Sequence, residues 1–184
     1  MRRLLVTAVV TTSLTGLAAC TSTAGQRAAT TGPAPVSTAV TANAVVRSVT
    51  DGDTVNVTID DQQEAVRLIG IDTPEVKDPD KPVECYGEAA SAHTKQLLPK
   101  GTPVRLERDA EARDKYGRLL AYVYRASDGL FVNLDLARQG YADVLSIPPN
   151  IAHAEDFRAA VAAARAADVG LWGACSAFGV PAVG

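Results

Sequence analysis

The sequence predicts an α+β fold in which five short strands form a small closed barrel and about three helices complete the domain. Two observations support this prediction. Five short segments show the apolar patterns of strands, and three longer segments, between and after them, show helical spacing. Five short strands suit a closed barrel better than an open parallel sheet.

The strands are expected in two groups. Residues 45–50 and 54–59 flank Asp51-Gly52-Asp53, which is typical of a turn, and the second segment places apolar residues at alternate positions. Residues 65–71 are almost continuously apolar, as in a strand that is buried on both faces. Residues 104–107 and 119–124 form the later pair.

Helices fill the intervals between these strands and follow the last one. We expect them at residues 87–98, 133–139 and 154–167. Gly140 directly follows the second, where glycine commonly ends a helix, and Gly170 lies shortly after the third.

The N-terminal residues are typical of an exported protein. Arg2-Arg3 precedes a Thr-rich apolar stretch, residues 4–14, that is too short to span a bilayer. Leu17-Ala18-Ala19-Cys20 resembles a lipobox, the bacterial lipoprotein signal that is cut before a cysteine that becomes acylated. An ordinary signal peptide with Cys20 incidental is the alternative, but the position of this scarce residue favours the lipobox. We therefore expect residues 1–19 to be a signal peptide, and lipid on Cys20 to anchor the protein at the extracytoplasmic face of the cell membrane.

A low-complexity segment separates that cysteine from the domain. Residues 20–43 are rich in Thr, Ala, Ser, Gly and Pro, and they hold one charge, Arg27, and no aromatic residue. Such a composition cannot bury enough apolar surface to fold, so we expect a flexible tether. Residues 44–178 then make one domain, and residues 179–184 are a short tail.

The three cysteines leave one without a partner, which needs an explanation in an exported protein. If Cys20 carries lipid, Cys85 and Cys175 remain, and an oxidising compartment favours a disulfide between them over two free buried thiols. Closing a loop of about 90 residues in this way would stabilise the fold by roughly 4 to 5 kcal/mol.

Three carboxylates stand at the ends of predicted strands or just beyond them. Asp53 heads one strand, Asp72 ends the buried strand, and Glu75 lies on the turn after Pro74. Taken singly, each is more often a turn, cap or surface residue. The two aspartates could still share a hard cation such as Ca²⁺, which prefers oxygen ligands, and Glu75 could polarise a water molecule. An EF-hand is a poor fit, because Val55 stands where another oxygen ligand is needed.

Two arginines indicate an anion. Arg67 is the only charge in an apolar strand, and because burying an unpaired guanidinium is costly, a structural carboxylate or a substrate phosphate must meet it. Arg118 enters a later strand from the turn Asp114-Lys115-Tyr116-Gly117 and could equally be a surface residue. A hard cation and two guanidinium groups on one anion would suit phosphoryl chemistry, in which charge stabilisation provides most of the catalysis. These residues therefore predict a phosphodiesterase, and specifically a nuclease.

Several short motifs are spread along the domain. Each is weak alone, but together and in this order they are specific for one family. They are Asp51-Gly52-Asp53-Thr54-Val55, Val66-Arg67-Leu68, Asp72-Thr73-Pro74-Glu75, Tyr86-Gly87-Glu88-Ala89-Ala90-Ser91, Asp114-Lys115-Tyr116-Gly117-Arg118-Leu119-Leu120-Ala121-Tyr122, Leu136-Ala137-Arg138-Gln139-Gly140 and Gly170-Leu171-Trp172. With them the domain resembles the staphylococcal nuclease-like (thermonuclease) family over residues 44–172. The resemblance implies an OB-fold barrel with three helices, and a Ca²⁺-dependent site that hydrolyses DNA and RNA to 3′-phosphorylated fragments.

The resemblance also implies roles for the acidic residues. Asp53, Asp72 and the backbone carbonyl of Thr73 would hold Ca²⁺ through the hard oxygens that it prefers. Glu75 would take a proton from the attacking water, or orient that water.

The cationic residues would act on phosphate. The resemblance implies that Arg67 and Arg118 bind it and stabilise the charge that grows at phosphorus, with Arg118 nearest the leaving 5′-oxygen. Lys115 and Tyr116 would hold a terminal phosphate of the substrate.

Two departures from the family pattern concern substrate binding. Tyrosines are missing near Ser146-Ile147-Pro148-Pro149-Asn150, so a stacking platform worth about 1 to 3 kcal/mol per base is lost. Residues 77–81 are less basic than a nucleic-acid channel would prefer.

The overall charge also concerns substrate binding. Without residues 1–19 the 18 Lys and Arg fall to 16, against 21 Asp and Glu, and an acidic protein gains little from counterion release. We expect a monomer that cuts single-stranded or frayed DNA and RNA distributively.

Two other functions compete with this one. A non-catalytic OB-fold module of the cell envelope that binds nucleic acid or protein is the main alternative, but such modules usually lose catalytic residues, and all of them are present here. An anchored protein that merely binds Ca²⁺ would explain the aspartates and not the arginines. Zinc is not indicated, because neither His93 nor His153 stands in a metal-binding spacing.

Overall fold

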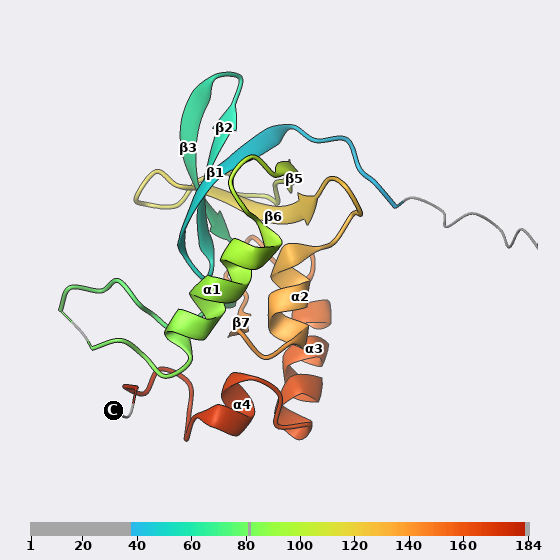
Figure 1. Ribbon diagram of the computed structural model, residues 1–184. Coiled ribbons are helices and arrows are strands. Elements are labelled where there is room, and N and C mark those ends of the chain that lie inside the picture. Colours follow the sequence, from blue (N-terminus) through green and yellow to red (C-terminus); the bar gives the residue numbers. More distant parts are fainter. Residues whose placement is uncertain (1–37, 81, 183–184) are drawn as a thin grey trace, which may run out of the picture. The chain divides into compact units, whose positions relative to one another are not determined.

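The computed structural model describes residues 38–80 and 82–182, which contain a closed barrel of five strands (Figure 1). The order around the barrel is β1-β2-β3-β6-β5; β3 and β6 run parallel, and the other neighbours run antiparallel. The predicted α+β barrel is confirmed. Strands β4 (Gly70–Asp72) and β7 (Asp143–Leu145) form a separate two-stranded sheet. The barrel strands are β1 (Ala44–Asp51), β2 (Thr54–Ile59), β3 (Gln62–Leu68), β5 (Pro103–Glu107) and β6 (Leu119–Arg125).

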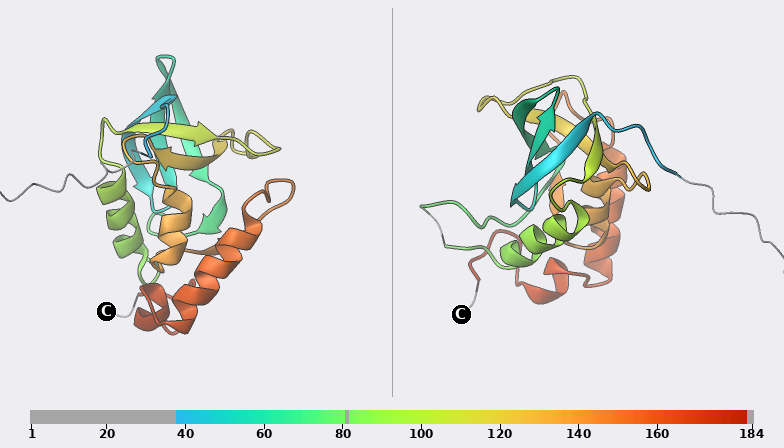
Figure 2. Two further views of the ribbon diagram at one scale, coloured as in Figure 1. Left: turned by 90° about the vertical axis from the view of Figure 1, so that its right-hand side faces the viewer. Right: turned by 45° about the horizontal axis from the view of Figure 1, so that its top comes forward.

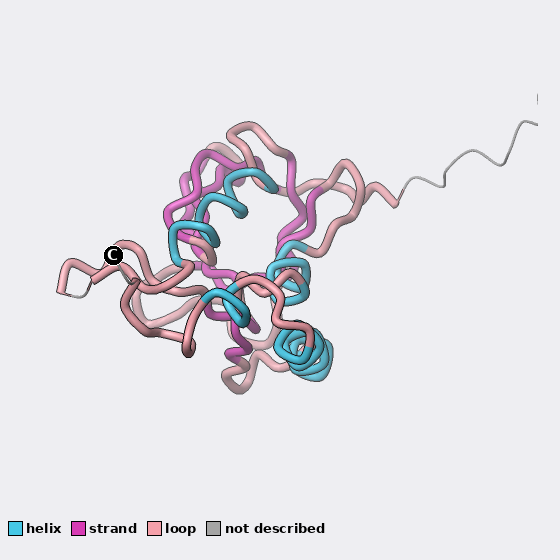
Figure 3. The backbone as a smooth tube through the Cα atoms, turned by 60° about the horizontal axis from the view of Figure 1, so that its bottom comes forward, coloured by secondary structure: helices cyan, strands magenta, loops and turns pink. Residues whose placement is uncertain are grey.

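The helices of the described residues gather at one end of the barrel, as both views in Figure 2 show. Figure 3 looks at the barrel from that end, where α1 and α2 lie against the strands and α3 lies farther out, against α2. The three predicted helices are present with nearly the expected bounds, and the four-residue α4 was not predicted. The bounds are α1 (Gly87–Leu97), α2 (Val132–Arg138), α3 (Ala154–Ala166) and α4 (Leu171–Ala174).

The predicted continuous strand at residues 65–71 is wrong, because the chain breaks between β3 and β4. Gly70 adopts a φ of 87°, in the left-handed region that favours glycine. A Cβ atom there would lie 2.1 Å from the ring of Phe157, which is buried on α3. The break redirects the chain, so that Asp72 at the end of β4 returns to face Arg67 on β3.

A buried asparagine on α2 fixes this break against β6. The Nδ2 atom of Asn133 donates to the carbonyl oxygens of Ile69, at 2.9 Å, and Ala121, at 3.2 Å. Its Oδ1 accepts a hydrogen bond from the N–H of Val123 at 2.9 Å. The side chain therefore hydrogen-bonds backbone groups on both sides of the interruption, Ile69 on one side and Ala121 and Val123 of β6 on the other. The apolar core around it includes Val46, Val55, Val57, Val66, Leu68, Val104 and Leu136.

The folded domain extends beyond both expected boundaries. Residues 38–43, which we placed in the tether, contact the barrel: the N–H of Val40 donates to the carbonyl of Ala126, and the side chain of Asn43 hydrogen-bonds the backbone of Leu106. Residues 180–182, which we placed in the tail, pair with residues 83–85. The signal peptide, Cys20 and residues 21–37 lie outside the described residues.

The predicted disulfide between Cys85 and Cys175 is present. It joins Cys85, two residues before α1, to Cys175, the residue just after α4. None of the described helices is long and apolar enough to cross a membrane.

Candidate active site

Arg67, on β3, lies at the centre of a cluster of charges. Its Nη2 atom lies 2.7 Å from Oδ1 of Asp72 and 3.2 Å from the carbonyl oxygen of Ile71. Its Nη1 atom forms an ion pair with Oδ2 of Asp53. Asp53 comes from the turn before β2, whose Thr54 pairs with Arg67, and Asp72 comes from the end of β4. The structure therefore supplies the carboxylates that a buried arginine requires.

The guanidinium of Arg67 is largely buried and is not saturated with hydrogen bonds. Its side chain is 13% exposed, and burial lowers the pKa of the group while the charge of Asp72 opposes that shift. Within the described residues Nη1 lies against Asp53 but donates no hydrogen bond of normal geometry. In this structure the guanidinium is therefore paired with both aspartates, through Nη1 with Asp53 and through Nη2 with Asp72.

Asp53, Asp72 and Thr73 bring oxygen atoms together beside that arginine. Thr73 donates from its N–H and its Oγ1 to Oδ2 of Asp53, at 3.0 and 3.1 Å. Gly52 permits this approach, because a Cβ atom there would lie 2.7 Å from Oγ1 of Thr73. No three His, Cys, Asp or Glu side chains of the described residues gather into a metal centre. Two carboxylates and a carbonyl, completed by water, nevertheless fit a hard cation such as Ca²⁺, because every donor is oxygen.

Glu75 follows this cluster on the loop between β4 and α1. Its Oε1 accepts hydrogen bonds from the N–H groups of Val76, at 3.0 Å, and Lys77, at 2.7 Å. A hydrogen bond with the carboxyl group of Asp51, and after it these backbone bonds, hold the pKa of Glu75 below its ordinary value although burial opposes them. Burial, and after it the contact with Glu75, raises the pKa of Asp51 to about 6. Of this pair, Glu75 is therefore the member that stays ionised.

Arg118 is oriented by Asp114, the first residue of the turn Asp114-Lys115-Tyr116-Gly117 that precedes it. Nε of Arg118 donates to Oδ2 of Asp114 at 2.7 Å, and Oδ1 of Asp114 accepts from the N–H groups of Tyr116 and Arg118 at 2.9 and 3.0 Å. Burial is the largest single effect on the pKa of Asp114 and would raise it. The hydrogen bonds from Arg118 and Tyr116 together outweigh burial, so the pKa lies below its ordinary value. Neither Nη atom of Arg118 is hydrogen-bonded to a described residue, so both remain free for an anion.

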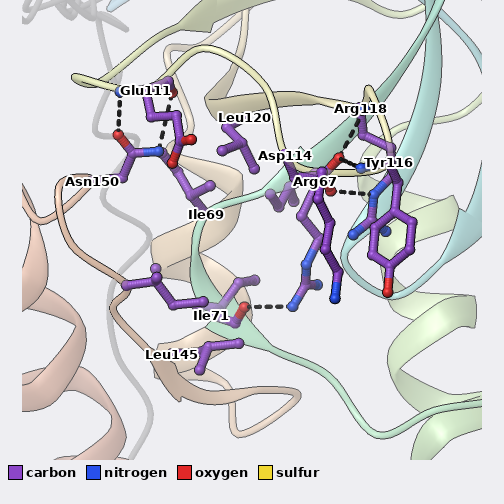
Figure 4. A pocket seen from close by; sticks show the side chains of 14 residues that line it. Arg67, Ile69, Ile71, Glu111, Asp114, Tyr116, Arg118, Leu120, Leu145 and Asn150 are labelled. Carbon is purple, nitrogen blue, oxygen red and sulfur yellow. Dashed lines mark hydrogen bonds and ion pairs between the residues drawn. The ribbon is translucent and has the colours of Figure 1, made fainter.

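Arg67 and Arg118 line one cavity of about 350 Å³ together with Lys115 and Tyr116 (Figure 4). The parallel pairing of β3 with β6 explains this, because it sets Arg67 opposite Leu120 and so brings the start of β6 to the same place. Tyr116 is 73% exposed, and Nζ of Lys115 lies 4.9 Å from the centre of its ring. Four of the expected site residues therefore line this cavity. The other four, Asp53, Asp72, Thr73 and Glu75, are not part of its lining.

Aliphatic side chains form the rest of the cavity wall. Leu145 and Ile147, 38% and 61% exposed, come from β7 and the segment after it. Ile69, Ile71 and Leu120 lie deeper. Among the described residues that line the cavity, Tyr116 is the one aromatic residue. It is therefore the one side-chain ring of the lining on which a nucleobase could stack.

Residues 65–174 match the protein family described as staphylococcal nuclease homologue, and this match covers more than half of the chain. The chain belongs to the staphylococcal nuclease family. The thermonuclease of Staphylococcus hyicus is 40% identical over 124 residues, which are 67% of this chain and 72% of that protein. The thermonuclease of Staphylococcus intermedius is 51% identical over 106 residues, 58% of this chain and 61% of that protein. Endonuclease YncB of Bacillus subtilis (strain 168) is 40% identical over 124 residues, 66% of this chain and 57% of that protein.

The family match includes most, but not all, of the site. The chain spans 61% of the S. intermedius thermonuclease and 57% of endonuclease YncB. The matched residues 65–174 hold both arginines and Glu75, but they begin after Asp53 and end one residue before Cys175. For this staphylococcal nuclease homologue, the position of Asp53 beside Arg67 therefore rests on the structure.

Three acidic residues were missed as parts of the site. Asp51 and Asp114 lie inside motifs that the sequence singles out, and their spacing from Asp53 and Arg118 could have indicated them. Glu84 carries no such signal, because its contact with Glu75 exists only when the loop between them closes.

Proposed function

We propose that this member of the staphylococcal nuclease family is a Ca²⁺-dependent phosphodiesterase that hydrolyses DNA and RNA to 3′-phosphorylated fragments. The observation that carries the proposal is the presence of two arginines, Arg67 and Arg118, from distant parts of the chain in one cavity. The Nη atoms of Arg118 have no hydrogen bond to a described residue, and two guanidinium groups on one cavity are the donors that a phosphate would satisfy. The printed names of the relatives, thermonuclease and endonuclease, agree with it.

In the proposed reaction the arginines hold the phosphate and Glu75 handles the proton. Oxygens of the phosphodiester accept hydrogen bonds from Arg67 and Arg118, which stabilise the charge that grows at phosphorus. The ionised Glu75 accepts a proton from water as the water oxygen attacks phosphorus. The bond from phosphorus to the 5′-oxygen breaks, that oxygen takes up a proton, and the phosphate stays on the 3′ end of the other fragment.

Asp53, Asp72 and the carbonyl oxygen of Thr73 would hold the cation. When bound, Ca²⁺ neutralises phosphate charge and lowers the pKa of a coordinated water. In this structure Arg67 neutralises the same two aspartates. Arg67 therefore borders both the aspartates that would hold the cation and the cavity that would hold the phosphate.

We propose that the protein binds its substrate weakly and at an exposed site. Lys115 and Tyr116, at the exposed edge of the cavity, would hold a terminal phosphate. The aliphatic wall offers a base little stacking surface, and the acidic mature chain gains little from counterion release. We propose that single-stranded or frayed nucleic acid is the substrate and that the protein acts as a monomer, which light scattering during gel filtration would test.

A zymogram on DNA and RNA tests the activity. We expect clearing with Ca²⁺ and none with EGTA, and a loss of about 10²-fold or more in Glu75→Gln, which keeps the shape of the side chain but not its basicity. Glu88→Gln, at an exposed position of α1, is the matched control and should clear like the wild type. Full activity in EGTA, or undiminished turnover by Glu75→Gln, would contradict the mechanism. Binding of nucleic acid without cleavage would support the non-catalytic module instead.

We further propose that the protein is exported and held at the extracytoplasmic face of the membrane by lipid on Cys20. The disulfide between Cys85 and Cys175 supports an oxidising location. Mass spectrometry of the native membrane fraction should find a mature N-terminus at Cys20 with acyl mass on it. Another N-terminus, or a Cys20 without acyl mass, would refute the anchor.

A further inference from the structure

Glu84 holds the backbone of Glu75 from both sides. The N–H of Glu75 donates to Oε2 of Glu84 at 2.9 Å, and the N–H of Glu84 donates to the carbonyl oxygen of Glu75 at 2.9 Å. The carboxylate of Glu75 is itself bonded to the N–H groups of Val76 and Lys77, the next two residues. Its position therefore follows the position of its own backbone, which Glu84 fixes.

The C-terminal segment in turn holds Glu84. The N–H of Cys85 donates to the carbonyl oxygen of Val180 at 2.7 Å, and the N–H of Ala182 donates to that of Val83 at 2.9 Å. Glu84 lies between these two bonds, opposite Pro181. Residues 180–182 thus pair with residues 83–85 in the antiparallel manner of two short strands.

Little besides the disulfide keeps this segment in place. Residues 173–182 bury none of their side chains fully, and several of them are exposed. Apolar burial therefore contributes little to their docking, and a few peripheral backbone hydrogen bonds open easily. The covalent bond between Cys85 and Cys175 therefore keeps residues 180–182 close to residues 83–85.

We propose that Glu84 is a positioning residue for Glu75, and that the Cys85–Cys175 disulfide maintains this position by docking residues 180–182 beside Glu84. The proposal rests on the proposed function, in which Glu75 accepts the proton of the attacking water. A displacement of a catalytic group by about 1 Å can cost about 10²-fold in rate, so a loose backbone at Glu75 would lower kcat. Binding of substrate depends on the cavity residues and should change little.

The first experiment compares Glu84→Ala with Glu84→Gln. Glu84→Ala removes the acceptor and should lower kcat about 10-fold or more with KM within about 2-fold of the wild type. Glu84→Gln keeps an acceptor oxygen but no charge, and should stay within about 3-fold of the wild type in kcat. The acid limb of the pH–rate profile should be the same in all three proteins. Equal losses in both variants, or a shifted acid limb, would show that Glu84 acts through its charge and would overturn the proposal.

The second experiment joins Glu84 to the disulfide. The double variant Cys85→Ser/Cys175→Ser should lose kcat in the same way, and adding Glu84→Ala to it should cost much less than it costs in the wild type. Full additivity of the two changes would mean that the disulfide does not act through Glu84, and would overturn that part. Val104→Ala, in the barrel core, is the control for lost stability and should leave kcat unchanged below its melting temperature.

Amide hydrogen exchange separates this inference from the proposed function. The N–H groups of Val76 and Lys77 should exchange faster in Glu84→Ala and in the cysteine double variant than in the wild type or Glu84→Gln. A wild-type protein that does not cleave nucleic acid would refute the proposed function, whereas the exchange rates would still decide whether Glu84 and the disulfide hold this backbone. Unchanged exchange in both variants would refute the positioning role.

Discussion

The carboxyl group of Asp51 and the carboxylate of Glu75 hydrogen-bond to each other, although Asp51 ends β1 and Glu75 lies beyond β4. Burial and then this contact raise the pKa of Asp51 to about 6, whereas the same contact lowers that of Glu75. The proton of the pair therefore resides on Asp51 under mildly acidic conditions. The arrangement keeps Glu75 ionised where the proposed reaction needs it.

The stability of the metal-free protein should consequently fall as the pH rises from about 4.5 to about 6. In this range the folded protein keeps a proton on Asp51 that the unfolded chain has already lost, so raising the pH through the folded pKa removes stability. Glu75, whose folded pKa is lowered, adds stability with rising pH only below its ordinary value of 4.5. Asp51→Asn should remove the decrease, as urea unfolding in EGTA at closely spaced pH values would show. The same pH slope in both proteins would contradict the assignment.

Replacing either arginine of the cavity by lysine should cost about 10²- to 10³-fold in kcat, because one lysine cannot reproduce the two parallel hydrogen bonds of a guanidinium. Arg67→Lys should also lower the free energy of unfolding, since Arg67 contacts Asp53, Asp72 and the carbonyl of Ile71. Arg118→Lys should fold normally. Turnover and urea unfolding are the two measurements.

Arg113→Lys is the control for these lysine variants. Arg113 stands just before the same turn, but its guanidinium is bonded to Glu64 and the carbonyl of Gly117 and is not part of the cavity lining. It should keep wild-type turnover. Near-normal kcat in either Arg67→Lys or Arg118→Lys would remove that residue from the proposed phosphate site.

Gly70→Ala should destabilise the fold far more than Gly101→Ala. Both glycines have a positive φ, 87° and 90°, so both substitutions carry backbone strain of about 1 to 3 kcal/mol. At Gly70 the new Cβ also meets the ring of Phe157 at 2.1 Å, whereas at Gly101 it meets nothing within 4 Å. The difference in unfolding free energy between the variants should be about 1 to 3 kcal/mol, the usual cost of overpacking. Equal losses would mean that Phe157 can move aside freely.

Ile147→Tyr should tighten binding of single-stranded DNA and lower KM, with little change in kcat. A ring on this exposed wall of the cavity would provide stacking worth about 1 to 3 kcal/mol per base. Ile151→Tyr is the matched control, because Ile151 is 50% exposed and does not line the cavity. Titration of a fluorescent oligonucleotide would measure the affinities. An equal gain in both variants would point to general surface hydrophobicity and not to the cavity.

Local patterns predicted the barrel well and its interruptions poorly. Alternation placed β2 within its observed bounds, since a barrel strand buries every second side chain. The break at Gly70 was missed because it depends on Phe157, which the chain reaches only through tertiary packing. Strand β7 and helix α4 have three and four residues, too few for a period to show.

The cavity residues were predictable because each carries a charge or a ring within a distinctive motif, and the resemblance joined those motifs into one site. Their neighbours were not. Asp51 looked like a turn residue, and its effect on Glu75 arises from burial that no local pattern reveals. Glu84 contacts Glu75 only across the loop between them, and no local pattern indicates how that loop folds.

The parallel pairing of β3 with β6 also determines when the protein can first act. Residues 66–68 meet residues 119–121 in that pair, so Arg67 and Arg118 remain apart in any chain that has not yet brought these segments together. A nascent or translocating polypeptide holds every residue of the phosphate site without forming the site. If the chain is exported, as we propose, and crosses the membrane before these segments meet, the nucleic acids of the cell that makes it are not exposed to an assembled phosphate site.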